Sequence, residues 1–141
     1  MAQAPSSVLA LDVGAKRVGV AVASLAARLP RPLTTLQADD ANFFATLQSL
    51  AETEGATALV VGYPRGLEGQ STAQTAVIEA FTHQLKEHSS LPIYLQDEAL
   101  TSKRAEAELT ARGKTYARGD IDALAASYIL EDWLTDHPEA R

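Results

Sequence analysis

One stretch decides how the chain is organised: Val8-Leu9-Ala10-Leu11-Asp12-Val13-Gly14-Ala15-Lys16-Arg17-Val18-Gly19-Val20-Ala21-Val22. Its first apolar run is rich in small and branched side chains, which is typical of a strand that is covered on both faces. A turn signal follows at residues 14–16, and a second apolar run begins at Val18. The stretch therefore predicts a β-hairpin.

The carboxylate of Asp12 stands at the far end of the first apolar run. A charge in that position is costly to remove from water unless a partner compensates it. A divalent cation is one such partner, because hard cations prefer carboxylate oxygens. Backbone N–H groups of the turn are another, and the spacing alone leaves both interpretations open.

Length and composition describe one globular domain, residues 1–141, with a single core. The absence of cysteine excludes disulfides and thiolate metal sites, so a metal would need oxygen or histidine ligands. Residues 1–7 lack the features of a secretory signal, and no apolar run approaches the roughly 20 residues that span a membrane. We therefore expect a cytoplasmic protein.

The net charge of −6 argues mildly against nucleic-acid binding, which usually involves a basic surface. Most basic residues nevertheless lie in or near the loops and helix starts that flank the candidate site. These are Lys16, Arg17, Arg28, Arg31, Arg65, Lys103, Arg104, Arg112, Lys114 and Arg118. Ordinary solvated surface charge would explain the same distribution equally well.

The remaining pattern predicts the order β-β-β-α-β-α-β-α-α. Residues 29–36 form a short strand whose two prolines suit a sheet edge. Asp39 and Asp40 supply the start of a helix that runs to Glu54 and is closed by Gly55. Residues 58–62 read as a buried parallel strand, and residues 91–95 as the last strand.

Helices fill the rest of the chain. Ser71 or Thr72 caps one of them, and its apolar face is expected to comprise Ala73, Ala76, Val77, Ala80, Phe81 and Leu85. His83 and His88 near its end fit solvated residues better than metal ligands. Thr101 or Ser102 caps a third helix, residues 111–118 read as a loop, and Asp120 caps the final helix.

Three acids occupy the edges of apolar elements: Asp12 after the first strand, Glu98 after the last strand, and Asp122 in the first turn of the final helix. If two neighbouring strand ends and the helix converge, the acids need cations between them, because like charges raise one another's pKa. One or two Mg²⁺ or Mn²⁺ ions would satisfy the set and could activate water against a phosphodiester. Asp97 and Asp120 compete for these roles. Asp97 and Glu98 are neighbours in the chain and would point to opposite faces of a strand, so only one of them can face the site. Asp120 and Asp122 are two residues apart on a helix and cannot share a face.

Several motifs together resemble a known family. They are Leu11-Asp12-Val13-Gly14 with Lys16-Arg17-Val18-Gly19-Val20-Ala21, Val61-Gly62-Tyr63-Pro64, Asp97-Glu98 with Leu100-Thr101-Ser102, and Asp122-Ala123-Leu124-Ala125-Ala126 with Ile129-Leu130. In order and spacing they are similar to the YqgF/RuvX family of RNase H-like Holliday junction resolvases, also described as pre-16S rRNA nucleases. The resemblance implies an α/β RNase H-like fold: a five-stranded mixed sheet, second strand antiparallel, flanked by helices. It also implies metal-binding catalytic acids at Asp12, Glu98 and Asp122.

The chain departs from the family at Ala99, where an arginine usually follows the acidic pair. A phosphate contact is then missing or supplied by Lys103 or Arg104. We also expect Lys16, Arg17 and Arg65 to hold substrate phosphates, because each lies beside a candidate metal-site segment.

The leading hypothesis is a metal-dependent nuclease that acts on branched DNA or on structured RNA, between which the sequence does not choose. A nucleic-acid-binding module with little catalysis is the alternative, supported by Ala99 and the acidic charge. A nucleotide-binding fold of the actin-like kinase type would need a far longer chain. We expect at most a weak or substrate-assisted homodimer, because the stripe Tyr128, Trp133 and Leu134 has the spacing of a helix packed on its own sheet.

Overall fold

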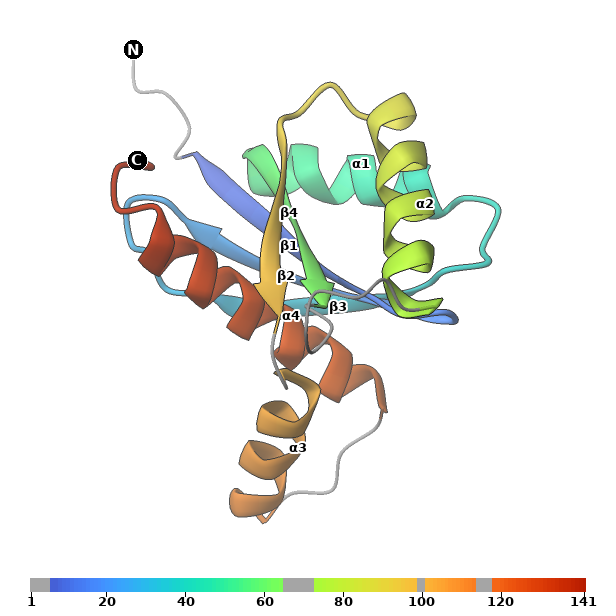
Figure 1. Cartoon of the computed structure of the whole chain (residues 1–141). Coiled ribbons are helices and arrows are strands. Elements are labelled where there is room, and N and C mark those ends of the chain that lie inside the picture. The colour runs from blue at the N-terminus through green and yellow to red at the C-terminus, as the bar shows by residue number, and fades with distance from the viewer. Residues whose placement is uncertain (1–5, 65–72, 99–100, 114–117) are drawn as a thin grey trace.

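The computed structural model describes residues 6–64, 73–98, 101–113 and 118–141, and within them a single mixed sheet organises the chain (Figure 1). Its strands are β1 (Ser7–Val13), β2 (Arg17–Ser24), β3 (Arg31–Gln37), β4 (Ala56–Pro64) and β5 (Ile93–Glu98). They lie in the order β3-β2-β1-β4-β5. Strands β1, β4 and β5 are parallel, and β2 is antiparallel to both of its neighbours. The five-stranded mixed sheet with an antiparallel second strand is confirmed.

The predicted hairpin forms between β1 and β2. The N–H of Gly14 donates to the carbonyl of Arg17 at 2.8 Å, which closes the turn. A Cβ on Gly14 would lie 2.9 Å from that same carbonyl oxygen, so glycine suits this tight closure. Asp12 pairs directly with Gly19 across the hairpin, a register on which the candidate site depends.

Helices cover both faces of the sheet (Figure 1). Helices α1 (Phe43–Glu54) and α2 (Ala73–His88) pack on the face that carries Leu9 and Leu11. Helix α4 (Arg118–Asp136) packs on the opposite face, over Val8 and Ala10. Helix α3 (Thr101–Ala111) contacts α4 beyond the sheet. Because β1 is buried on both faces, its apolar run is continuous.

Helix α1 begins later than the sequence predicts. Asp39 and Asp40 lie in a turn, where the Asp40 carboxylate accepts a hydrogen bond from the N–H of Asn42 at 2.8 Å. This local bond competes with the helix, so α1 starts at Phe43. Its end is as predicted, because Gly55 adopts the left-handed conformation with φ of 66°.

The predicted apolar face of α2 is confirmed at Leu85, which is buried, and at Phe81, which packs against the core, but it is wrong at Ala73, Ala76, Val77 and Ala80, which are exposed. The buried positions are Thr75, Ile78, Thr82 and Leu85, whereas Val77 is 39% exposed. The Thr82 hydroxyl donates to the carbonyl of Ile78 at 2.8 Å, so its burial leaves no unpaired donor. The predicted caps Ser71 and Thr72 lie outside the described residues.

The starts of the last two helices also differ from prediction. Thr101 and Ser102 lie inside α3 and do not precede it. Helix α4 begins at Arg118, so Asp120 belongs to its first turn and is not the N-cap. Most of the expected loop 111–118 falls between these helices, and residues 114–117 are outside the described part of the chain.

Helix α4 is buried on more than one side, as its sequence predicts. Ile129 and Leu130 contact the sheet, while Ala125 packs with Ala105 of α3. Trp133 and Leu134 are only 3% and 5% exposed, which confirms that this part of the predicted stripe packs on the chain's own sheet. Tyr128, the third residue of the stripe, is partly buried against the cluster between α3 and α4. In the part of the chain that the structure describes, no helix is both long and apolar enough to cross a membrane.

An arginine fastens the end of α4 to the connection between β2 and β3. The Arg28 guanidinium donates to the carbonyl of Leu134 at 2.6 Å and to that of Ala140 at 2.5 Å. These bonds satisfy carbonyls at and beyond the helix end. Arg28 itself has a φ of 55°, an unusual value for a non-glycine residue. Helix α4 is thereby held on the sheet at its far end.

Candidate active site where helix α4 meets the β1–β2 hairpin

Asp12 lies on the sheet face that α4 covers. It pairs with Gly19, and directly paired residues of an antiparallel ladder have their side chains on the same face. A Cβ built on Gly19 would lie 2.0 Å from the backbone oxygen of Asp122 in α4. The side chain of Asp12 is therefore on the same face as the first turns of α4, and it is partly buried there.

Gly19 allows α4 to lie directly on β2. The Cβ that any other residue would carry meets not only Asp122 but also the backbone nitrogen of Ala123, at 2.7 Å. Those atoms are helix backbone and have little freedom to move aside. The glycine of the hairpin motif therefore lets the Asp122 backbone lie close to β2, at the residue that pairs with Asp12.

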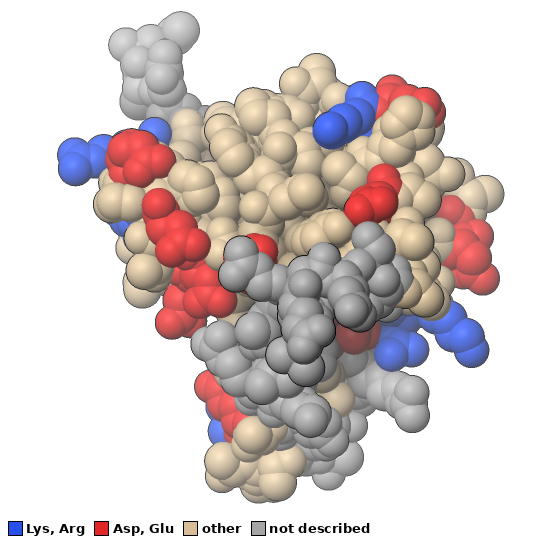
Figure 2. All heavy atoms as spheres, in the orientation of Figure 1, with Lys and Arg blue, Asp and Glu red and all other residues tan. Residues whose placement is uncertain are grey.

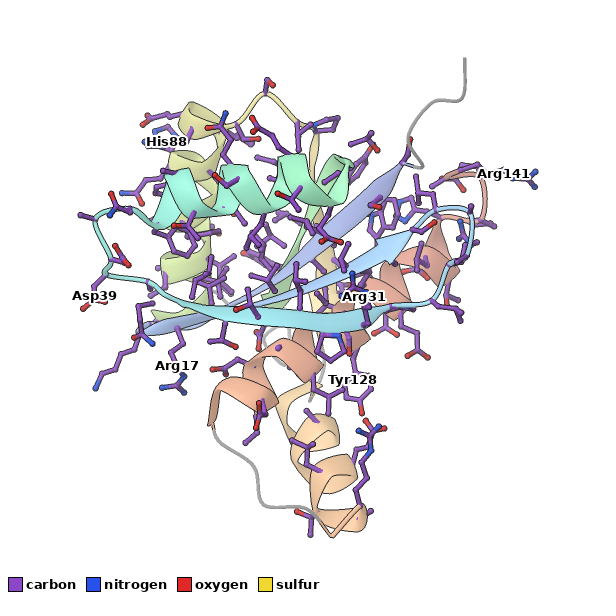
Figure 3. The ribbon with its side chains drawn as sticks, turned by 180° about the vertical axis from the view of Figure 1, so that it is seen from behind. Arg17, Arg31, Asp39, His88, Tyr128 and Arg141 are labelled. Atoms are coloured by element: carbon purple, nitrogen blue, oxygen red, sulfur yellow. The ribbon has the colours of Figure 1, made fainter. Side chains whose placement is uncertain are left out.

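An ion pair joins the hairpin to α4. The Nε of Arg17 donates to Oδ2 of Asp122 at 2.6 Å, and their side chains are 31% and 19% exposed. Figure 3 labels Arg17, whose side chain extends from the hairpin end. A charge-assisted bond of this length between half-buried partners is among the stronger polar contacts in proteins. The sequence motifs predict separate roles for these two residues and carry no signal of their contact.

Glu98 is the last residue of β5 and lies in register with Pro64 of β4. The expectation that the ends of the first and last strands are neighbours is wrong, because β4 lies between β1 and β5. At about 4.8 Å per strand, β1 and β5 are roughly 10 Å apart. The side chain of Glu98 lies outside what the structure describes.

Alternate positions of β5 face α4. The ring of Tyr94 lies 5.4 Å from that of Trp133, and the side-chain nitrogen of Gln96 donates to Asp136 at 3.0 Å. Asp97, the next residue after Gln96, is in register with Tyr63, which packs on the α1–α2 side. Asp97 is therefore on the face away from Asp12.

The predicted phosphate-binding residues are only partly visible. Lys16 is exposed in the hairpin turn, where its carbonyl accepts a bond from the N–H of Ala38 at 2.9 Å. Arg65 lies outside the described residues, and Lys103 and Arg104 are placed in α3 without described side chains. Among the described residues, no cluster of three or more acidic or histidine side chains is assembled for a metal.

Tyr63 contributes a contact that sequence reasoning missed. Its hydroxyl donates to the carboxylate of Glu79 in α2 at 2.8 Å. This hydrogen bond raises the pKa of Tyr63, with burial and the Glu79 charge acting in the same direction and a hydrogen bond with Thr75 opposing them. The contact ties the end of β4 to α2. The only signal for it was the place of Tyr63 in the motif Val61-Gly62-Tyr63-Pro64.

Acidic side chains are spread over the face seen in Figure 2, and basic ones lie mainly at its periphery. One basic group is at the lower right, where Figure 1 places the end of the β1–β2 hairpin. This distribution agrees with the net charge of −6. On the face shown, the basic group at the hairpin end is one place where a polyanion could be attracted locally.

Comparison with known proteins decides the family. The sequence model of RuvX, described as Holliday junction resolvase, matches residues 6–136. The chain belongs to the RuvX family. A relative from Chloroflexus aurantiacus, named as a candidate pre-16S rRNA nuclease, is 38% identical over 130 residues, covering 90% of this chain and 85% of the relative. One from Pseudomonas savastanoi pv. phaseolicola with the same name is 34% identical, covering 93% and 92%.

A solved structure confirms the fold of this RuvX chain. It is similar to T. thermophilus RuvC in complex with a Holliday junction substrate, with a TM-score of 0.56 and 16% sequence identity. The alignment covers 95% of this chain and 97% of RuvC. The RNase H-like fold expected from the resemblance is thus present. Membership of the RuvX family, with its relatives, assigns the chain to the nucleases.

Proposed function

We propose that the chain is an endonuclease in which Asp12, Glu98 and Asp122 hold one or two Mg²⁺ or Mn²⁺ ions. The supporting observation is the meeting of the hairpin and α4 at Gly19, which gathers Asp12 and Asp122 on one face. Position 98 follows Tyr94 and Gln96 at a period of two, which favours the same face. We propose that this set lies within a single domain spanning residues 1–141.

The chemistry of these residues fits a hard divalent cation. All three are carboxylates, the ligands that Mg²⁺ and Mn²⁺ prefer. Asp122 already attracts a positive group, since the Arg17 guanidinium lies 2.6 Å from its oxygen. A carboxylate that is 19% exposed is accessible to a small ion and sheltered enough for the attraction to be weakly screened.

The bound metal would polarise the phosphodiester and activate a water molecule for attack on phosphorus. The chain's own basic residues would bind and orient the substrate. Lys16 and Arg17 at the hairpin end are one group, with Arg65, and Lys103 and Arg104 of α3 are a second. They would neutralise phosphates without reading base sequence.

For the substrate we propose structured nucleic acid: the 5′ end of precursor 16S rRNA, a branched DNA junction, or both. The names of the Chloroflexus and Pseudomonas relatives favour the RNA. The RuvX description favours the junction. A junction needs two symmetric cuts, and a substrate-assisted homodimer would supply them. Such a dimer would not use Trp133 and Leu134, because both are buried in the chain's own core.

The deciding experiment compares wild type with Asp12→Asn on matched DNA-junction and RNA substrates, in Mg²⁺ and in Mn²⁺. We expect the substitution to lower cleavage by several orders of magnitude, because a metal-holding charge is lost. Asp120→Asn is the matched control, an exposed acid on the same helix as Asp122, and should cleave like wild type. Normal cleavage by Asp12→Asn would place the site elsewhere. Wild type that binds both substrates and cuts neither would favour the binding-module alternative.

A further inference from the structure

The ion pair between Arg17 and Asp122 occupies the place where the proposed function requires a metal. The Nε of Arg17 lies 2.6 Å from Oδ2 of Asp122, within direct hydrogen-bonding distance. A divalent cation on the same carboxylate would face the positive guanidinium at short range. Two like charges so close repel strongly, all the more where water is partly excluded. Arg17 and a metal ion therefore compete for Asp122.

We propose that Arg17 is the resident counter-ion of Asp122 in the metal-free protein, and that a divalent cation displaces its guanidinium toward the substrate phosphate. The proposal rests on the proposed metal-dependent function. Arg17 then binds two partners in turn, the Asp122 carboxylate before metal binds and the substrate phosphate afterwards. The charge predicted from sequence to hold phosphate is then released for that role only when metal is present.

The placement of Arg17 suits such an exchange. It is the first residue of β2, directly after the exposed turn residue Lys16, and its side chain is 31% exposed. The bond to Asp122 uses Nε, and a guanidinium has further N–H donors on its two terminal nitrogens. A rotation about its long side chain would redirect those donors without moving the strand.

The position of Asp122 does not depend on this ion pair. Helix α4 is held on the sheet by Ile129 and Leu130, which are buried in the core, and by Arg28 at its far end. Helix α4 should therefore stay in place when Arg17 leaves. This separates the proposed exchange from a purely structural salt bridge, whose loss would loosen the helix.

The first test is a calorimetric titration of Mn²⁺ into the metal-free full chain, without nucleic acid. Arg17→Gln removes the competitor and should bind Mn²⁺ about 3- to 10-fold more tightly than wild type. Lys16→Gln is the matched control, since it removes one positive charge from the adjacent residue, which is exposed in the turn. Its Mn²⁺ affinity should change less than about twofold, because an exposed charge is screened.

Equal or weaker Mn²⁺ binding by Arg17→Gln would overturn the exchange while leaving the metal site standing. Absence of Mn²⁺ binding by wild type and both variants would instead refute the proposed metal-dependent function, and the exchange with it. The two failures are therefore distinguishable.

The second test is an NMR titration of the wild-type protein with Mg²⁺, and a variant is used only to assign the Arg17 resonance. The Nε–H resonance of Arg17 in the wild-type NMR spectrum should report its bond to the carboxylate. We expect Mg²⁺ to shift this resonance as the guanidinium leaves Asp122. An Arg17 signal that stays in place at saturating Mg²⁺ would contradict the proposal.

Discussion

The two faces of the central sheet are built from different kinds of side chain. Toward α1 and α2 the strands present large apolar residues, among them Leu9, Leu11 and Leu59. Toward α4 the same strands present mostly small ones, such as Ala10, Ala21 and Ala58. At the site end of the hairpin the small residue is Gly19, with no side chain at all.

The two kinds of side chain have different consequences for stability and for the candidate site. Large interlocking side chains on the α1–α2 face bury apolar area and keep those helices at a distance from the sheet. Small side chains on the α4 face let the helix backbone approach the strands closely. Asp122 can then reach the hairpin that carries Asp12 and Arg17. One face supports the fold, and the other brings the polar residues together.

The largest effect of a single substitution is expected on the α1–α2 face. Leu11 is 0% exposed, and Leu11→Ala should lower the free energy of unfolding by about 2–5 kcal/mol through lost burial and a cavity. Chemical denaturation measures the loss. Leu95→Ala, at a position 53% exposed, is the control and should change it by less than about 0.5 kcal/mol. Comparable losses for both would mean that this face is not the stabilising one.

An intermediate effect is expected on the α4 face. Gly19→Ala would place a Cβ 2.0 Å from the Asp122 backbone oxygen, so α4 must shift. We expect about 1–3 kcal/mol of destabilisation, and a roughly 100-fold fall in cleavage because the acids are misplaced. Both are measurable on one preparation, by denaturation and by single-turnover cleavage.

Gly113→Ala separates crowding from backbone strain. Its Cβ would meet nothing within 4 Å, but the residue has a φ of 68°. It should therefore lose about 1 kcal/mol of stability and keep its cleavage rate. If Gly19→Ala cleaves as well as Gly113→Ala, the close approach of α4 is not what positions the acids.

The smallest effect concerns the exposed charge at the hairpin end. Lys16→Gln should weaken substrate binding uniformly across sequences and reduce the slope of log affinity against log salt by about 1. Lys86→Gln is the control, because Lys86 lies in the last turn of α2, on the face of the sheet opposite α4. Equal salt slopes for the two variants would return Lys16 to ordinary surface charge.

Much of the fold was predictable because its signals are local. The hairpin follows from two apolar runs around Gly14, and the end of α1 from a glycine that can adopt a positive φ. The burial of α4 on more than one side is predictable because its apolar residues are spread around the helix. The edge position of β3 agrees with Pro32, the one proline within the strand. In each case neighbouring residues carry the information that sets the conformation.

Which residues come into contact depends on the tertiary structure. Ala76, Val77 and Ala80 predicted the buried face of α2, yet Thr75 and Thr82 are buried, because burial depends on what the fold places opposite the helix. Strand order is equally non-local, and it inserts β4 between the strands that carry Asp12 and Glu98. The sequence identified Arg17 and Asp122 as functional candidates by motif. Their contact joins residues 105 positions apart and exists only because Gly19 lets α4 close on the hairpin.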